Sequence, residues 1–448
     1  MALQSGMAGD GHSGSGLTHE ELKDNFSDLH PPLNAHEAAV EADRCYFCYD
    51  APCMTACPTS IDIPLFIRQI SAGNPNGAAR TILNQNIMGG MCARVCPTET
   101  LCEEVCVRET AEGKPVKIGQ LQRYATDHLM ESGKHPFKRA AKTGKKVAVV
   151  GAGPAGLAAA HRLAMHGHAV TVFESRKKPG GLNEFGIAAY KAVDDFAQKE
   201  VEFILGIGGI SIKTGKTLGK NLDLDALRDG HDAVFLGIGL SGVNALGIDG
   251  EAGKGVEDAI KYIGTLRQAS DLSSLPVGQN VVVIGGGMTA IDVAIQSKLL
   301  GARDVTILYR RSQAEMGASA FEQELAKTKG VIIRHNAMPV KIKRKRGKAA
   351  SVVCERTAVK NGKVVGTGET FELAADSVFK AIGQNFVDVL GGKLKVEKGR
   401  IVVDADKKTS VRGIWAGGDC IANGKDLTVA AVDDGRRAAE SIHAALSA

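Results

Sequence analysis

Eight cysteines are crowded into one short stretch of a chain that is otherwise poor in cysteine. The chain has 448 residues and ten cysteines, and only Cys354 and Cys420 lie outside the stretch. Thiolates are soft ligands that suit zinc and iron–sulfur clusters, so the stretch predicts a metal-binding segment whose folding depends on what it binds. The eight residues are Cys45, Cys48, Cys53, Cys57, Cys92, Cys96, Cys102 and Cys106.

The spacing of these cysteines helps to distinguish a zinc site from an iron–sulfur site. The pattern is C-x2-C-x4-C-x3-C-P, followed by C-x3-C-P and C-x3-C. Zinc sites usually have two CxxC-type pairs separated by a finger-length loop. Three close ligands followed by a cysteine before proline, here Pro58, are instead typical of ferredoxins with two clusters. The spacing favours iron–sulfur clusters, with zinc and unliganded thiols as the alternatives.

The residues around the cysteines indicate helices. Apolar residues recur at helical spacing in the segment from Ile63 and again in the segment from Ala78. We expect a helical domain over 31–140, with the cysteines mostly in turns between its helices. The first 16 residues are rich in Gly and Ser, and we expect a flexible tail over 1–30.

A dinucleotide fingerprint follows the helical domain. The apolar run from Val147 leads into the loop GAGPAG and an Ala-rich helix, and the next strand ends at Glu174. The glycines let the backbone approach a pyrophosphate at a helix N-terminus, and the acid accepts hydrogen bonds from a ribose. The candidate loop residues are Gly151, Ala152, Gly153, Ala155 and Gly156.

The same pattern returns later in the chain with a different strand end. Here the strand after the loop ends in Arg310 and Arg311 instead of an acid. Because a guanidinium pairs with a 2′-phosphate, the second site favours NADPH over NADH. The candidate loop residues are Gly285, Gly286, Gly287, Met288, Thr289 and Ala290.

A third motif suggests that the first site holds FAD. A short strand ends in Gly418 and Asp419, and a helix begins at about Thr428. In flavoproteins with two dinucleotide sites, such a late motif completes the FAD site. We therefore predict an α/β fold: an N-terminal α-helical iron–sulfur domain followed by two Rossmann-like domains. The expected boundaries are 141–265 and 386–448 for FAD binding and 266–385 for NAD(P)H binding.

Composition excludes several other classes of protein. The net charge of +5 is nearly balanced over this length, and aromatic residues are scarce, so no nucleic-acid partner is expected. No signal peptide and no apolar run of about 18 residues are visible. We expect a cytoplasmic protein without a membrane segment. The basic run KIKRKRGK from Lys341 to Lys348 is interpreted as a solvated hairpin.

Taken together, the motifs resemble those of a known family. The chain resembles the NAD(P)H-oxidising part of dihydropyrimidine dehydrogenase and is similar to the small subunit of bacterial glutamate synthase. The resemblance is carried by CYFCYDAPCMTACPTSIDIPLFI, CARVCPTETLCEEVC, IGQLQRYATD, VGAGPAGLAAA, FESRKKPGGL, IGGGMTAID, YRR and WAGGDC. One departure is the loop after GGL, where Tyr190 and Lys191 replace the usual aromatic and basic residues and the proline is missing.

The resemblance implies a particular ligand set for two [4Fe–4S] clusters. It assigns Cys45, Cys48, Cys53 and Cys106 to one cluster. It assigns Cys57, Cys96, Cys102 and Gln122 to the other, which leaves Cys92 without a cluster. It also extends the FAD site to Gly181, Leu182, Lys191, Leu218 and Gly239, and the NAD(P)H site to Ile382 and Gly383.

The resemblance implies an electron-input subunit. FAD would take a hydride from NADPH or NADH, and the clusters would carry electrons to a separate FMN-containing subunit that reduces uracil or thymine. No general acid or nucleophile is expected, because the cofactors perform the chemistry. Gln122 favours dihydropyrimidine dehydrogenase, since the glutamate synthase subunit carries Glu at this place. A glutamate synthase small subunit and a cluster-bearing redox scaffold or sensor are the alternatives.

Overall fold

The computed structural model describes residues 16–448, which form two units. The larger unit contains residues 28–244 and 383–448, and the smaller unit contains residues up to 27 and residues 245–382. The sequence predicted that the chain passes from the FAD-binding domain to the NAD(P)H-binding domain after residue 265. The boundary between the two units lies earlier, after residue 244, because the strand β6 (Val256–Asp258) pairs with β13 (Ser377–Ala381) in the sheet of the smaller unit.

The larger unit begins with a helical region, as expected. Its apolar core includes the fully buried Phe66, Ile67, Ile82 and Leu121. Pro and Asn or Asp residues begin several of the helices, so their N-termini are defined locally. The elements are α2 (Ala35–Ala42), α3 (Pro52–Ala56), α4 (Ile63–Ser71), α5 (Pro75–Gln85), α6 (Gly89–Val95), η1 (Thr98–Thr100), α7 (Val107–Glu112) and α8 (Ile118–Glu131).

The rest of the larger unit is built on a parallel sheet. The strand order is β17-β4-β1-β2-β3, and each strand is parallel to its neighbours. The strands are β1 (Lys146–Val150), β2 (Ala169–Phe173), β3 (Ile210–Lys213), β4 (Ala233–Leu236) and β17 (Ile414–Ala416). The helices are α9 (Pro154–Met165), α10 (Leu182–Phe185), η2 (Ala189–Lys191), α11 (Phe196–Leu205), α12 (Leu224–Gly230) and α16 (Thr428–Ser447).

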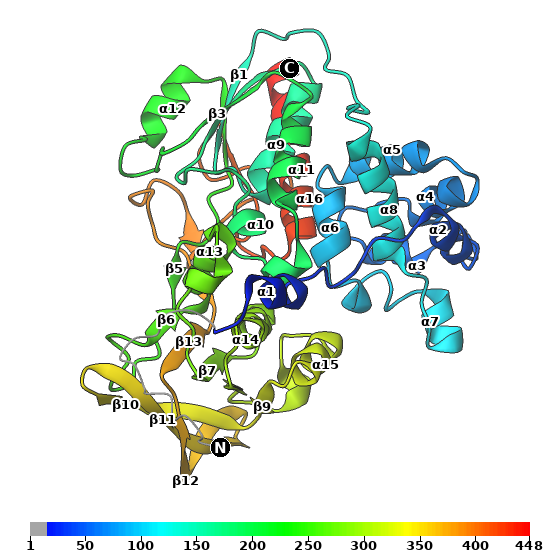
Figure 1. Ribbon diagram of the computed structural model, residues 1–448. Helices are drawn as coiled ribbons and strands as arrows, with labels where there is room; N and C mark the ends of the chain where they lie inside the picture. Colours follow the sequence, from blue (N-terminus) through cyan, green and yellow to red (C-terminus); the bar gives the residue numbers. More distant parts are fainter. Residues whose placement is uncertain (1–15) are drawn as a thin grey trace. The chain divides into compact units, whose positions relative to one another are not determined.

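Helices α9 and α16 pack along each other beside this sheet (Figure 1). A Cβ at Gly435 of α16 would lie 2.0 Å from the carbonyl oxygen of Ala155, so only glycine permits this close approach. Two short ribbons complete the unit. They are β5 (Gly242–Val243) with β14 (Gln384–Asn385), and β15 (Val396–Glu397) with β16 (Arg400–Ile401).

The smaller unit contains a second parallel sheet in the order β6-β13-β7-β8-β9. An antiparallel sheet of β10, β11 and β12 lies in the chain between β9 and β13, and the basic run forms the β10–β11 hairpin, as predicted. The remaining elements are α13 (Ala259–Gln268), η3 (Leu272–Ser274), β7 (Asn280–Gly285), α14 (Met288–Leu299), β8 (Asp304–Leu308), η4 (Gln313–Glu315), α15 (Ala320–Thr328), β9 (Ile332–Arg334), β10 (Ala337–Lys345), β11 (Lys348–Lys360) and β12 (Lys363–Ala374).

The expected flexible tail over 1–30 is helical from residue 19, and its first 15 residues lie outside the described chain. Helix α1 (His19–Asn25) begins at a capping box between Thr18 and Glu21. Leu22 is buried, and the side chain of Asn25 donates to the carbonyl of Leu299 in the same unit. A local cap and a buried apolar contact therefore order a segment whose composition suggested a tail.

Candidate functional site

Four cysteines of the helical region surround one pocket. Cys45, Cys48, Cys53 and Cys106 all line it, together with apolar side chains such as Ile63 and Ile67. Burial, together with the neighbouring Cys45 and Cys106, raises the pKa of Cys53 to about 12. Such crowding is unfavourable for free thiolates and is relieved by iron cations, so these residues fit a [4Fe–4S] cluster.

The remaining cysteines form a second group. Burial, with Cys92, Cys102 and Cys57 nearby, raises the pKa of Cys96 well above its usual range. Burial also raises the pKa of Cys102, and Cys57 contributes to that shift. In residues 16–448, no three His, Cys, Asp or Glu side chains are spaced to hold a single metal ion. Cys57, Cys92, Cys96 and Cys102 thus lie near one another, and Cys53 of the first group also contributes to the shift at Cys102.

Gln122 lies on α8, where it is 8% exposed. Its Nε2 donates to the carbonyl of Gly89 at 2.7 Å, and its Oε1 receives no hydrogen bond within the described chain. The amide oxygen is therefore the end of Gln122 that remains available to a metal. Cys92 is 3% exposed on α6, and burial raises the pKa of its thiol.

The first Gly-rich loop joins β1 to α9 at the carboxyl edge of its sheet. Gly151 has φ +98°, and a Cβ there would lie 2.2 Å from the carbonyl oxygen of Gly237 at the end of β4. At Gly156 a Cβ would lie 1.9 Å from the carbonyl oxygen of Gly151. A Cβ at Gly153 would meet only the Cα of Gly181, at an ordinary contact distance of 3.7 Å, so this position is less crowded than Gly151 and Gly156 and suits the approach of a pyrophosphate.

Glu174, the acid that follows β2, is folded back onto this loop. Its Oε2 accepts a hydrogen bond from the backbone N–H of Ala152 at 2.8 Å. Its Oε1 accepts from the backbone N–H of Arg176 at 2.7 Å and from the hydroxyl of Ser175 at 3.1 Å. A carboxylate has about four acceptor sites and these contacts use three of them, so one ribose contact, at Oε2, still fits.

Other predicted FAD residues converge on the same loop from distant parts of the larger unit. A Cβ built at Gly181 would lie 2.6 Å from the Cα of Gly153, and one at Gly418 would lie 3.3 Å from the Cβ of Ala155. A Cβ at Gly239 would lie 3.5 Å from the Oδ1 of Asp419. These close approaches leave the Asp419 carboxyl beside the loop, where burial raises its pKa to about 6.

Besides the predicted Thr428, several residues that the sequence did not single out hold this arrangement. Asp434 of α16 accepts a hydrogen bond from the N–H of Gly418 at 3.0 Å. Thr428 donates to the side chain of Asn183 at 2.8 Å, and Asn183 contacts the sulfur of Met88 at 3.7 Å. These contacts join segments far apart in the chain, so local motifs give no signal for them.

Three predicted FAD residues lie in other surroundings. Leu182 begins α10, next to Gly181. Lys191 is 9% exposed on η2, beside the buried Tyr190 of the loop that departs from the family pattern. Leu218 lies in an apolar core with Phe173, so its side chain serves packing.

The second Gly-rich loop repeats this geometry in the smaller unit. Gly285 has φ +146°, and a Cβ there would lie 2.1 Å from the carbonyl oxygen of Ala381 at the end of β13. A Cβ at Gly286 would lie 2.4 Å from the ring of Tyr309, whereas Gly287 has nothing within 4 Å. Met288 and Thr289 begin α14, followed by the buried Ala290.

Arg310 and Arg311 follow β8 and are both exposed. Neither guanidinium forms an ion pair within the described chain, so both are available to a phosphate. Ile382 directly follows β13 in the smaller unit. Gly383 belongs to the larger unit, where its carbonyl accepts from the N–H of Asn244 at 3.2 Å.

Comparison with known proteins agrees with both parts of this site. Residues 145–435 match the pyridine nucleotide-disulphide oxidoreductase family. Residues 22–134 match domain II of dihydropyrimidine dehydrogenase, which is described as a 4Fe-4S cluster domain. None of the helices in the described part of the chain has the length and apolar character needed to cross a membrane.

Similar proteins cover nearly the whole chain. The NAD-dependent dihydropyrimidine dehydrogenase subunit PreT of Escherichia coli K12 is 35% identical over 93% of this chain and 96% of its own length. The glutamate synthase [NADPH] small chain of the same organism is 34% identical over 94% of each chain. The structure of Mycobacterium tuberculosis FprA in complex with NADPH matches with a TM-score of 0.57 and 21% identity, over 68% of this chain and 85% of FprA.

The FprA likeness supports the fold, and the closer relatives and family matches support the cofactors. FAD, NAD(P)H and 4Fe-4S chemistry belong to the matched domains. The two glycine loops and the two cysteine groups supply residues suited to each of them. The chain therefore belongs to the pyridine nucleotide-disulphide oxidoreductase family, as an NAD(P)H-dependent FAD oxidoreductase with an N-terminal iron–sulfur domain of the dihydropyrimidine dehydrogenase type.

Proposed function

We propose that this chain is the electron-input subunit of a dihydropyrimidine dehydrogenase. It oxidises NAD(P)H and delivers electrons to a separate FMN-containing subunit that reduces uracil or thymine. The observation that carries the proposal is Gln122, a buried amide with a free oxygen at the position where the glutamate synthase subunit is expected to carry Glu. The similarity to PreT over 96% of that protein supports it.

The residues of the chain have distinct tasks in this proposal. Bound FAD accepts a hydride from NAD(P)H, and the 4Fe-4S clusters carry single electrons onward. Gly153 and Gly287 leave room for the two pyrophosphates, at the N-termini of α9 and α14. Glu174 binds a ribose of FAD, and Arg310 with Arg311 binds the 2′-phosphate of NADPH.

The cluster ligands are part of the same proposal. Cys45, Cys48, Cys53 and Cys106 hold one cluster, and Cys57, Cys96, Cys102 and Gln122 hold the other. Paired substitutions test the second set through iron content and the EPR spectrum of the reduced protein. Gln122→Ala is expected to alter or remove one cluster, whereas Cys92→Ala is expected to leave both. The opposite result would transfer the ligand role to Cys92.

A specific observation favours the second candidate, a glutamate synthase small subunit. PreT is named as NAD-dependent, whereas the glutamate synthase relative is named for NADPH. The exposed Arg310 and Arg311 favour NADPH and so agree with the second name. The identities of 35% and 34% do not separate the two relatives. A redox scaffold is not retained, because the matched family consists of oxidoreductases.

Reconstitution with each kind of partner separates the two functions. The purified chain is expected to reduce an artificial dye with NAD(P)H and to leave uracil unchanged. Addition of an FMN-containing dihydropyrimidine dehydrogenase subunit is expected to restore uracil reduction. Glutamate formation from glutamine and 2-oxoglutarate with a glutamate synthase large subunit, without uracil reduction, would replace the proposal by its alternative. Uracil turnover by the single chain would also overturn it.

A further inference from the structure

Glu200 is a buried carboxylate that the functions described above do not use. It lies on α11 and is 1% exposed. Its Oε1 accepts a hydrogen bond from the backbone N–H of Met91 at 2.9 Å. Its Oε2 has no partner within the described chain. Burial of a carboxyl group with one unpaired oxygen is unfavourable in free energy, so a structural or functional role is expected for Glu200.

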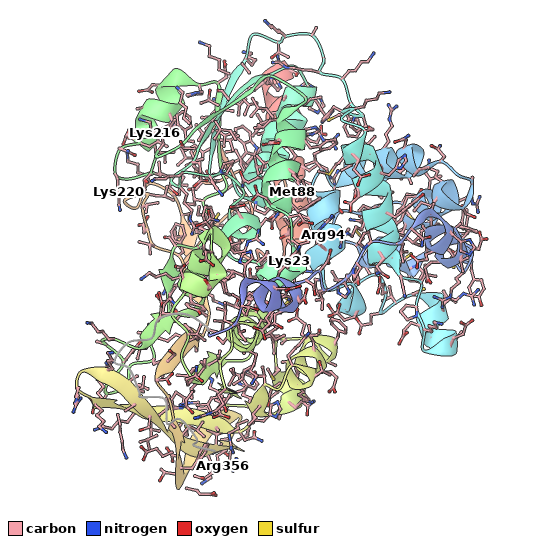
Figure 2. The ribbon with its side chains drawn as sticks, viewed as in Figure 1. Lys23, Met88, Arg94, Lys216, Lys220 and Arg356 are labelled. Carbon is pink, nitrogen blue, oxygen red and sulfur yellow. The ribbon has the colours of Figure 1, made fainter. Side chains whose placement is uncertain are left out.

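The turn that Glu200 holds also holds Gln122. The carbonyl of Gly89 accepts the hydrogen bond from Gln122 Nε2, and Gly89 is joined directly to Gly90. On the other side, Arg94 donates to the carbonyl of Gly90 at 3.0 Å and pairs with Asp127 of α8 at 2.8 Å. Figure 2 labels Arg94 on α6 and Met88 just before that helix.

The packing around this turn leaves it little freedom. A Cβ at Gly89 would lie 2.6 Å from Ile82, and a Cβ at Gly90 would lie 2.6 Å from the ring of Phe196. The guanidinium of Arg94 lies 3.4 Å from the centre of that ring. The turn is therefore packed tightly between the helical region and α11, and Glu200 makes the hydrogen bond from α11 to this turn.

Helix α11 also contacts the loop of the FAD site. Gln198 donates to the carbonyl of Pro179 at 2.8 Å and to the Oε2 of Glu184 at 2.9 Å, on either side of Gly180 and Gly181. One helix thus holds the flavin loop through Gln198 and the cluster turn through Glu200.

We propose that Glu200 is a positioning residue for Gln122, and that it thereby sets the redox properties and retention of the cluster that Gln122 binds. The inference rests on the proposed cluster ligands. Hydrogen-bond partners of metal ligands fix ligand orientation, and their loss typically lowers metal affinity 10- to 100-fold. Burial raises the pKa of Glu200 to about 8, so a neutral amide of the same shape is a suitable replacement.

The test compares variants of the full holoprotein. In Glu200→Leu, we expect the EPR signal and midpoint potential of the Gln122 cluster to change in the same direction as in Gln122→Ala. The iron-chelator concentration that removes this cluster is expected to fall about 10- to 100-fold, with the flavin and the other cluster retained. Glu200→Gln is expected to restore the normal signal, because its Oε1 can still accept the hydrogen bond from the N–H of Met91.

Two matched controls on α11 separate positioning from stability. Val201→Ala removes apolar contacts from a residue that is 2% exposed, and is expected to lower the unfolding temperature without changing the EPR signal. Glu202→Ala removes an exposed carboxylate and is expected to change neither property. An unchanged EPR signal and chelator resistance in Glu200→Leu, with a clear effect of Gln122→Ala, would overturn the role of Glu200 alone. No effect of either variant would overturn the assignment of Gln122 as well.

Discussion

The two glycine-rich loops have nearly the same backbone geometry but different neighbours. In each, the first glycine has a positive φ and lies against the last carbonyl of a returning strand, Gly237 beside Gly151 and Ala381 beside Gly285. In the first loop the neighbouring strand ends in Glu174, which is bonded back to the loop. In the second, Arg310 and Arg311 extend into solvent.

This comparison distinguishes the features that bind a pyrophosphate from those that determine which dinucleotide is bound. The pyrophosphate needs a tight turn and open space at a helix N-terminus, and both loops provide these. The choice depends on the charge that follows the second strand, and there the loops differ in sign. One difference within the loops is the third position, which is Gly156 in the first and Ala290 in the second.

The largest expected effect is at this third position. Gly156→Ala places a methyl group 1.9 Å from the carbonyl oxygen of Gly151, so α9 must move away from the loop. We expect loss of FAD, measured as flavin absorbance per protein. The reverse change, Ala290→Gly, is the control and is expected to keep NAD(P)H binding, at a stability cost of about 1 kcal/mol. Retention of FAD by Gly156→Ala would show that the two positions tolerate the same side chain.

The next effect concerns the first glycine of the second loop. In Gly285→Ala, the new methyl group lies 2.1 Å from the carbonyl oxygen of Ala381, and φ is +146°. Stopped-flow mixing with NAD(P)H is expected to give no flavin reduction, while the flavin and cluster absorbance remain. Loss of the flavin together with NAD(P)H reduction would contradict the independence of the two loops.

A smaller effect is expected at the ends of the strands. Arg310→Ala and Arg311→Ala each remove a charge-assisted contact worth about 1.5–3 kcal/mol. The KM for NADPH should therefore rise about 10- to 100-fold, and the KM for NADH should change little. Arg303→Ala is a matched control, since Arg303 is an exposed arginine before the same strand that pairs with Asp304 at 2.9 Å. An equal rise in the KM for NADPH and the KM for NADH would contradict the proposed selectivity for NADPH.

The smallest effect is expected at the acid of the first loop. Glu174→Gln keeps one oxygen acceptor but places an NH2 group opposite a backbone N–H, either that of Ala152 or that of Arg176. An unmade buried hydrogen bond costs about 1–3 kcal/mol, so FAD should dissociate roughly 10-fold more readily. Ser175→Ala, which removes only the hydroxyl donor at 3.1 Å, is the control and should leave FAD affinity nearly unchanged. An unchanged affinity of Glu174→Gln for FAD would show that Glu174 does not contribute to FAD binding.

The family resemblance drawn from the sequence motifs is confirmed by the family matches, and the α/β architecture is confirmed with it. The expected start of α16 at Thr428 is also correct. The expected tail and the first unit boundary needed correction, because α1 is capped and buries Leu22, and β6 pairs with β13. In both cases a long-range contact overrode what local composition suggested.

The sequence by itself determined the parts that depend on neighbouring residues. A glycine-rich turn between an apolar strand and a helix specifies its own backbone, and the cysteine spacing indicates cluster chemistry without reference to the rest of the chain. The resemblance already grouped Cys106 with Cys45, and the structure places both cysteines at one pocket. Only the tertiary structure brought Glu200 to the turn that holds Gln122. Glu200 and Met91 lie 109 residues apart in the chain, so the packing of separate elements decides their contact, and no local pattern records it.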